Sequence, residues 1–367
     1  MSAPLRQRDY SLTGPDGARA VELGLASAAW YRSDIPRETM KALLQRSDGP
    51  AIRDTVLWLG SMVLTGGLGV WFWGSWWCVP FFAAYGVLYG SASDSRWHEC
   101  GHGSAFRTPW MNRAVYQIAC FMIMRNPVTW RASHIRHHAD TIIVGRDAEI
   151  TVTRPAKLLR LLGAFFGIFD VPHAMKLMVR NASGRLDPEE ALYIPEALHP
   201  RVVRVARVWC VIYVATAGAA IAMQSILPFM LIGLPRYYGA WHHVLTGLLQ
   251  HGGLAENVLD HRLNSRTVLI NPISRFIYWN MNYHVEHHMF PMVPYHALPK
   301  LHALLRDDFP APTRSIWAGY RELIPTVLIQ RRNPDWFIKR ELPPTAKPYR
   351  PEFHGDIDPV MVERTAA

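Results

Sequence analysis

Long stretches with few charged side chains restrict the fold of this 367-residue chain more than any other feature. Residues 55–72 and 76–93 form one closely spaced pair of such runs, and residues 208–227 and 229–249 form a second pair. A helix that crosses a bilayer needs about 20 mostly apolar residues, so each run is near the required length. We therefore expect an all-α integral membrane protein with four transmembrane helices in two hairpins.

The last run is the weakest of the four because polar side chains interrupt it. Arg236 lies near its middle and follows Pro235, and His242 and His243 come shortly afterwards. A charge inside a span is costly unless it is paired or faces a polar cavity. Two interpretations follow: the helix is tilted or broken at Pro235 and leaves Arg236 near water, or Arg236 contacts the substrate or a loop that carries metal ligands.

The distribution of basic residues indicates how the hairpins are oriented. All 39 lysines and arginines except Arg236 lie outside the four runs and their turns. The positive-inside rule then places both termini and the middle segment in the cytoplasm, in a multi-pass protein. The first 50 residues are polar and lack the apolar core of a cleavable signal.

The alternative is that the four runs are buried helices of a soluble protein, since the mean hydropathy is only 0.00. We favour the membrane, because large polar segments account for that average. Two shorter apolar stretches, residues 114–124 and 158–169, are too short or too closely flanked by charge to cross. They are expected to form helices that lie on the membrane interface.

Composition excludes several classes of protein. Only 19% of the residues are charged, which argues against disorder and coiled coil, and no two of the four cysteines form a CxxC pair. An iron–sulfur site within the chain is therefore not expected, and electrons for a redox reaction would come from another protein. The formal charge of +10 fits attraction to anionic lipids and to an acidic electron donor. No basic helix or aromatic stacking motif accompanies it, so nucleic acid is not an expected partner.

Histidines gather in three short motifs and at one isolated position. The motifs are His98-Glu-Cys-Gly-His102, His134-Ile-Arg-His137-His138 and His284-Val-Glu-His287-His288, and the isolated residue is His251, directly after the fourth run. Spacings of three and four residues place side chains on one helix face, so each motif is expected to present its imidazoles to a common point. All four pieces of chain lie on the side assigned to the cytoplasm. We expect them to meet in a cytoplasmic helical cap that carries a metal site.

Nine imidazoles suit two metal ions better than one. A single ion takes about four to six ligands, whereas two ions that each keep an open position match the number nine. Imidazole binds iron, zinc and copper, so ligand type alone leaves the element open. The motifs contain no bridging carboxylates of the kind that hydrolytic metal pairs use, which favours iron that activates dioxygen. The alternative is that each histidine has an ordinary hydrogen-bond partner.

The three motifs, in this order around two hairpins, resemble those of the membrane fatty-acid desaturase family, whose relatives include alkane and acyl hydroxylases. The resemblance rests on HECGH, HIRHH and NYHVEHHMFP. It implies a di-iron centre, with O2 as co-substrate, bound by His98, His102, His134, His137, His138, His284, His287 and His288, and by His251 as the additional ligand after the last span. The expected organisation is a cytoplasmic segment over residues 1–54, a desaturase-like membrane and catalytic domain over 55–304, and a cytoplasmic segment over 305–367.

Three functions stay open at this level. The leading hypothesis is an oxygen-dependent desaturase that introduces a double bond into a lipid acyl chain or a related aliphatic metabolite. A hydroxylase on the same scaffold is the first alternative, and a non-enzymatic membrane protein that binds metal is the second. Either enzyme needs a separate electron donor of the ferredoxin, rubredoxin or cytochrome b5 type, together with its reductase.

Residues near the motifs are candidates for supporting roles. Metal-bound imidazoles usually donate their other ring N–H to a carboxylate or carbonyl. The acidic residues close to the motifs in sequence are Asp94, Glu99, Asp140, Asp147, Glu256, Asp260 and Glu286. His242 or His243 could line a path for the substrate, whereas His261 has no partner at ligand spacing and is not expected to bind metal.

Overall fold

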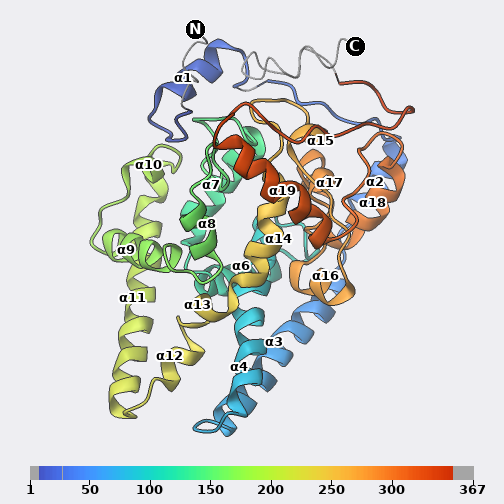
Figure 1. Cartoon of the computed structure of the whole chain (residues 1–367). Helices are drawn as coiled ribbons and strands as arrows, with labels where there is room; N and C mark the ends of the chain where they lie inside the picture. Colours follow the sequence, from blue (N-terminus) through green and yellow to red (C-terminus); the bar gives the residue numbers. More distant parts are fainter. Residues whose placement is uncertain (1–7, 27, 350–367) are drawn as a thin grey trace.

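The computed structural model describes residues 8–26 and 28–349. Within these ranges the chain is helical, and its only β contacts are isolated bridges between Thr267 and Tyr283 and between Val268 and Thr313. The long helices α3 (Asp48–Trp71) and α11 (His199–Ala222) extend from a body of shorter helices, as Figure 1 shows. The expectation of an all-α fold is confirmed for the described residues.

The first hairpin pairs α3 with α4 (Cys78–Val87), and glycines let the two helices approach closely. A Cβ atom on Gly66 would lie 3.0 Å from the ring of Tyr85, and one on Gly69 would lie 3.0 Å from the ring of Phe82. The aromatic rings of α4 therefore occupy the space that side chains at these two positions of α3 would fill. Close packing of this kind is typical of helix pairs with small residues at their interface.

The second helix of this hairpin does not end at the predicted limit of the apolar run. A π-helical turn, η1 (Leu88–Ala92), joins α4 directly to α5 (Ser93–His102), so the helical path continues to the first histidine motif. Trp58 of α3 donates its indole N–H to the carbonyl of Leu88, at a distance of 2.8 Å. This bond ties α3 to the start of the π-turn.

The helix predicted over residues 229–249 is instead three short helices: α12 (Leu227–Leu231), α13 (Pro235–Gly239) and α14 (Trp241–His251). Gly233 has a φ of 92° and Pro235 lacks a backbone N–H, so a continuous helix cannot pass this point. The expected break at Pro235 is confirmed, but its expected consequence is wrong. Arg236 is buried, 4% exposed, and donates a hydrogen bond of 2.6 Å to the carbonyl of Gly90 in η1.

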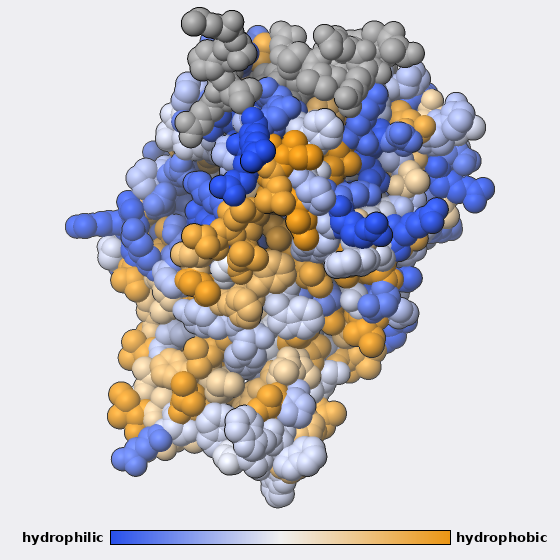
Figure 2. Space-filling view, viewed as in Figure 1, coloured by the Kyte–Doolittle hydropathy of each residue, from blue (hydrophilic) through white to orange (hydrophobic). Residues whose placement is uncertain are grey.

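One helical stretch among the described residues, 196–222, is long and apolar enough by itself to cross a membrane. The first hairpin and α11 also expose large apolar side chains, including Val63 (73%), Trp76 (87%) and Ile221 (78%). Figure 2 shows the same division: hydrophobic residues cover much of the lower part of the molecule, and most strongly hydrophilic residues lie in the upper part. Contiguous exposed apolar surface of this kind marks contact with lipid or with another protein.

Shorter helices form the body that carries and surrounds the histidine motifs (Figure 1). They are α1 (Pro15–Glu22), α2 (Arg37–Leu43), α6 (Pro109–Met122), α7 (Pro127–Ala139), α8 (Leu158–Ala164), α9 (Asp170–Ala182), α10 (Pro188–Ala191), α15 (His261–Asn264), α16 (Pro272–Tyr278), α17 (His284–Met289), α18 (Leu298–Leu305) and α19 (Ile316–Gln330), with single 3-10 turns at η2 (Glu196–Leu198) and η3 (Tyr295–Ala297). The two shorter apolar stretches fall on α6 and on α8 with the turn that follows it. The largest buried cluster joins this body to the first hairpin, and its members range from Tyr31 to Phe309.

Candidate metal centre

The structure brings all nine imidazoles that the sequence analysis singled out into two adjacent groups. The five-member group contains His98, His102, His134, His138 and His287, and the four-member group contains His137, His251, His284 and His288. Within each group the candidate ligand atoms all lie within 4.8 Å of one another. The groups touch, because the rings of His138 and His288 have centroids 4.5 Å apart.

Each HxxHH motif contributes to both groups, which differs from the expectation that a motif faces a single point. On α7, His134 and His138 join the five-member group while His137 joins the other. On α17, His284 and His288 join the four-member group while His287 joins the five-member group. Two residues four apart lie above one another on a helix, whereas a residue three positions after the first is displaced around the helix axis. The motif therefore places ligands on two neighbouring centres.

The distances between ring nitrogens match the separation expected between two nitrogen ligands of the same metal ion. In the five-member group, Nε2 of His134 lies 3.1 Å from Nε2 of both His102 and His138. In the four-member group, Nε2 of His284 lies 3.0 Å from that of His251 and 2.9 Å from that of His288. A metal–nitrogen distance of about 2.0–2.1 Å produces separations of roughly 3 Å between neighbouring ligands.

The protonation state of these imidazoles also favours metal binding. Burial, reinforced by the neighbouring imidazoles, lowers the pKa of His98, His134, His284 and His288 well below the usual value, so these rings are neutral at physiological pH. Neutral imidazole is the form that binds metal. Nε2 of His98 is buried and has no hydrogen-bond partner among the described residues, as expected of a nitrogen that a cation would occupy. The residues present therefore fit a pair of metal ions.

Groups outside the two clusters orient several of the rings. Nδ1 of His137 lies 2.8 Å from a carboxylate oxygen of Asp147, and Nδ1 of His134 lies 3.1 Å from one of Glu149. Nδ1 of His251 lies 2.8 Å from the backbone carbonyl of residue 264. With Nδ1–H donating outwards, Nε2 is left free to face the metal, which fixes both the tautomer and the ring plane.

Among the described residues, Asp147 is the one of the seven proposed acidic residues that forms a hydrogen bond with a clustered imidazole. The others form different contacts: Asp94 accepts from Trp97, Glu99 from Ser104, Asp140 pairs with Arg146, Glu256 with Arg8, Asp260 with Arg262, and Glu286 accepts from Thr267. Glu149 was missed. The available signal was its position in the loop after the second motif, two residues beyond Asp147 and therefore able to reach the same helix.

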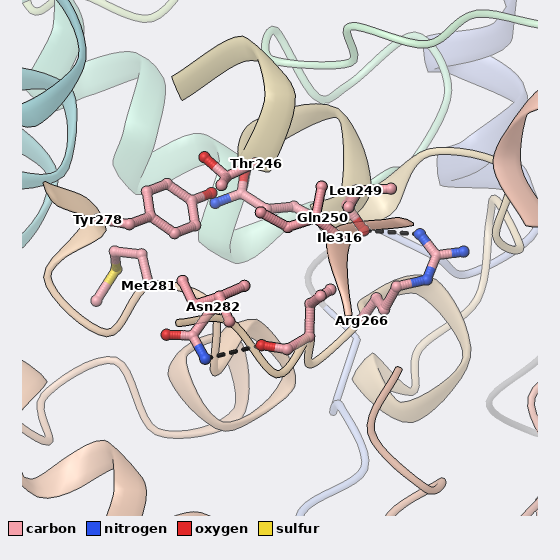
Figure 3. A pocket seen from close by; sticks show the side chains of 10 residues that line it. Thr246, Leu249, Gln250, Arg266, Tyr278, Met281, Asn282 and Ile316 are labelled. Carbon is pink, nitrogen blue, oxygen red and sulfur yellow. Dashed lines mark hydrogen bonds between the residues drawn. The ribbon is translucent and has the colours of Figure 1, made fainter. Parts of the chain in front are cut away.

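The end of α14 that carries His251 is held by a buried arginine (Figure 3). The guanidinium of Arg266 donates to the carbonyls of Leu249 at 2.7 Å and Gly252 at 3.2 Å. Burial lowers the pKa of Arg266 to about 10, so the group stays protonated at neutral pH. The last carbonyls of a helix have no intrahelical partners, and a cation there satisfies them and interacts well with the helix dipole. Arg266 thereby fixes the position of His251.

Other histidines near the site lie outside both groups. Nε2 of His242 lies 3.0 Å from Ser274 Oγ, and His261 stacks on Trp30 with ring centroids 4.3 Å apart. His261 is also close to His288, at 5.2 Å between centroids, but it does not join the four-member group. His243 lines the cavity beside the imidazoles, whereas His242, the other residue considered for such a position, does not.

A cavity of about 490 Å³ lies next to the two groups, between α7, α8 and α14. His98 and His134 of the five-member group line it, together with His137, His251 and His284 of the four-member group. Its volume is in the range of cavities that bind small organic ligands. The site therefore combines two sets of nitrogen donors with room for a substrate beside them.

Comparison with known proteins places the chain in a family. The profile of the family described as fatty acid desaturase matches residues 74–320. The omega-3 fatty acid desaturase of the endoplasmic reticulum of Nicotiana tabacum is 27% identical over 223 residues, which are 55% of this chain and 58% of the relative. The acyl-lipid omega-3 desaturase (cytochrome b5) of Arabidopsis thaliana is 24% identical over 245 residues, covering 61% of this chain and 62% of the relative.

A third relative is the chloroplastic sn-2 acyl-lipid omega-3 desaturase (ferredoxin) of Helianthus annuus, 24% identical over 286 residues, or 73% of this chain and 63% of the relative. The chain thus spans somewhat less than two thirds of the length of these relatives. The matched residues include all nine imidazoles of the two groups. The chain belongs to the fatty acid desaturase family, a family of oxidoreductases of lipid metabolism.

Proposed function

We propose that the protein is an oxygen-dependent di-iron desaturase that introduces a carbon–carbon double bond into a lipid acyl chain or a related aliphatic metabolite. The observation that carries the proposal is the convergence of nine imidazoles in two adjacent groups beside a cavity, in a member of this family. Donor sets made of imidazole alone suit iron and dioxygen chemistry better than hydrolysis by a metal pair.

The five-member and four-member groups would each hold one iron ion. Bound there, the pair would catalyse the four-electron reduction of dioxygen to two waters. Two of the electrons would come from the donor, together with two protons from solvent, and the other two would come from the substrate as two hydrogen atoms. The alkene is left as the product. Such chemistry is beyond side-chain acids and bases, so the protein contributes placement of the substrate and exclusion of water.

Several residues of this chain would orient the metal ligands or line the substrate cavity. Asp147 and Glu149 hold the rings of His137 and His134, and Arg266 holds the helix end that carries His251. Trp97 stacks beside His98, with centroids 5.4 Å apart, and lines the cavity. A bulky indole at this position excludes water from the side of the cavity nearest the imidazoles.

The electrons would come from a separate protein of the ferredoxin, rubredoxin or cytochrome b5 type with its reductase. The names of two relatives specify cytochrome b5 and ferredoxin. In this chain all four cysteines are free, and the metal-binding groups found among the described residues contain histidine only. A basic chain with a formal charge of +10 suits an acidic donor.

We further propose that the protein is a multi-pass membrane protein whose catalytic face is cytoplasmic. The α3–α4 hairpin and the α11–α12 pair would enter the bilayer, with the imidazoles above them. Support comes from the apolar surface of these helices and from the basic residues of the remaining chain. The relatives named for the endoplasmic reticulum agree with a membrane location.

The decisive experiment supplies the purified, iron-loaded protein with a donor, its reductase, oxygen and candidate acyl substrates, and analyses the products by mass spectrometry. Loss of two hydrogens supports the desaturase. Gain of one oxygen would identify the hydroxylase instead. A preparation that binds zinc or a single metal per chain, and yields neither product with lipid or metabolite extracts, would favour a non-enzymatic metal-binding protein.

A further inference from the structure

We propose that the cavity beside the imidazoles selects an aliphatic substrate whose far end carries a neutral hydrogen-bonding group, such as a hydroxyl, a ketone or an amide. Asp94, Arg125 and His243 would recognise that group, and they form what we call the polar end of the cavity. The inference rests on the proposed function, because it names the class of substrate that this reaction uses. A plain alkyl terminus would be a poor match for the same surface.

The polar end lies beyond the imidazoles, toward the apolar helices. On α5, Asp94 precedes His98 by one turn, about 6 Å along the axis. On α14, His243 precedes His251 by about two turns, or roughly 12 Å. All four residues line the same cavity, so a chain that passes the imidazoles toward the first turns of these helices meets polar side chains there.

The charges at the polar end compensate each other. Arg125 Nη1 lies 3.7 Å from Asp94 Oδ1, and Trp97 donates its indole N–H to the same oxygen at 3.1 Å. The guanidinium of Arg125 also lies over the ring of Trp130, 3.9 Å from its centroid. A charged substrate end would leave one charge uncompensated in this half-buried place, whereas a neutral donor or acceptor would not.

His243 offers a hydrogen-bonding atom that lacks a partner. Its backbone N–H donates to Ser91 Oγ at 3.0 Å, which fixes His243 of α14 against η1, and its imidazole ring forms no hydrogen bond with a described residue. The neighbouring His242 does not line the cavity, and its Nε2 lies 3.0 Å from Ser274 Oγ. An alkyl end pressed against the polar end would displace water and leave these groups unsatisfied, which is costly; a hydroxyl or amide would satisfy them.

The other part of the cavity is suited to the head of the substrate. Lys157 and Arg160, both exposed, line it at the start of α8, and neither forms an ion pair with a described residue. A carboxylate or phosphate bound there would leave the aliphatic part to run past the imidazoles. The substrate would therefore have an anionic head at these two cations and a neutral polar group at Asp94, Arg125 and His243.

Binding of matched probes to the full-length, iron-loaded protein in detergent tests the proposal without turnover. Octanoic, decanoic and dodecanoic acids and their ω-hydroxy derivatives are titrated by calorimetry. At one chain length or more, the hydroxy acid is expected to bind at least about tenfold more tightly than the plain acid, within the discrimination that a site built for a hydroxyl achieves. Equal binding within every pair, or binding of no probe at all, would overturn the proposal.

Variants separate the polar end from the head. His243→Leu is expected to abolish the preference for the hydroxy acid, and His243→Gln to restore part of it. Lys157→Met is the matched control: it should weaken both acids of a pair equally and leave their ratio unchanged. Iron content reports whether each variant is folded, and Asp94→Leu replaces His243→Leu if the latter loses its iron. A full preference retained in the folded Leu variant would remove the polar end from the site.

The outcome is independent of the proposed reaction. A hydroxy-acid preference in a protein that forms no alkene would leave the binding site intact and contradict the desaturase. An alkene formed from a plain acyl chain, without any preference between the probes, would support the desaturase and contradict the polar-end proposal.

Discussion

The two imidazole groups differ in how the protein holds them from outside. In the four-member group, His137 is bonded to Asp147, His251 to the carbonyl of residue 264, and Nδ1 of His288 lies 3.2 Å from Thr141 Oγ1. In the five-member group, within residues 8–26 and 28–349, the corresponding outer contact is that of His134 with Glu149. Outer hydrogen bonds fix ring orientation before metal binds. The four-member group is therefore preorganised, whereas the five-member group depends more on packing and on the metal itself.

Removal of one imidazole from each group should have the largest effect and separates their metal requirements. His284→Ala leaves three ligands in its group, and His287→Ala leaves four. Both are expected to abolish product formation, but His284→Ala should lose up to one of two irons per chain. Three protein ligands are the fewest that catalytic sites use, so its group is left without a spare donor, whereas His287→Ala still leaves four ligands and should retain more iron.

Iron per chain and product yield are measured together, with His199→Ala as the control. His199 lies far from both groups in sequence and is bonded to the carbonyl of Ile194. Activity retained by either of the two variants would remove that histidine from the ligand set. Equal iron contents would contradict the difference between the groups.

Changing the outer carboxylates to amides should have the next largest effect. The carboxylate of Asp147 is fully buried, and it raises the pKa of His137 to about 9 against the lowering effect of burial. Glu149 is more exposed and lies farther from its imidazole. Asp147→Asn is expected to lower iron affinity about 10–100-fold, and Glu149→Gln less, because the stronger outer contact orients its ring more tightly.

Competition with a chelator measures both affinities, and Glu341→Gln, a change at an exposed acidic residue outside the groups, provides the baseline. The reverse order, with Glu149→Gln more damaging, would show that the five-member group is the one the protein preorganises. Unchanged affinity in both variants would mean that these carboxylates stabilise the fold without tuning the site.

Arg266 offers a smaller effect through the backbone that carries His251. Arg266→Met leaves the carbonyls of Leu249 and Gly252 without their donor. A buried group that loses its partner costs about 1–3 kcal/mol, so the melting temperature should fall and the four-member group should release iron more readily. Arg321→Met, at an exposed position of α19, is the control. A lower melting temperature with unchanged iron affinity would show that Arg266 supports only the fold.

The sequence was most informative where periodicity and chemistry coincide. The positions of the motifs and of His251 relative to the apolar runs predicted that the nine histidines share one region, and the all-α fold followed from the runs themselves. Periodicity alone could not show that each HxxHH motif divides between two groups, since that depends on the angle at which α7 and α17 meet. Asp147 could be named from its proximity, but not distinguished from Glu286, whose carboxylate accepts from Thr267 instead. The burial of Arg236 against Gly90 depends on how α13 packs on η1, which no local pattern encodes.

The smallest predicted effect on the metal site concerns the helix that carries His98 and His102. A Cβ atom at Gly90 would lie 2.7 Å from the carbonyl oxygen of Pro235 and 2.9 Å from the carbonyl carbon of Gly239, both backbone atoms of the adjoining segment. Gly90→Ala is therefore expected to destabilise the protein by about 1–3 kcal/mol and to loosen the five-member group, since the packing of Gly90 fixes α5.

Gly67→Ala is the matched control: a Cβ there meets nothing within 4 Å, and alanine favours a helix interior by about 0.5–1 kcal/mol. Thermal unfolding in detergent should thus shift in opposite directions for the two variants. If Gly90→Ala unfolded at the temperature of Gly67→Ala, then α5 would be positioned by its side chains rather than by this backbone contact, and the five-member group would be less dependent on packing than the comparison with its neighbour implies.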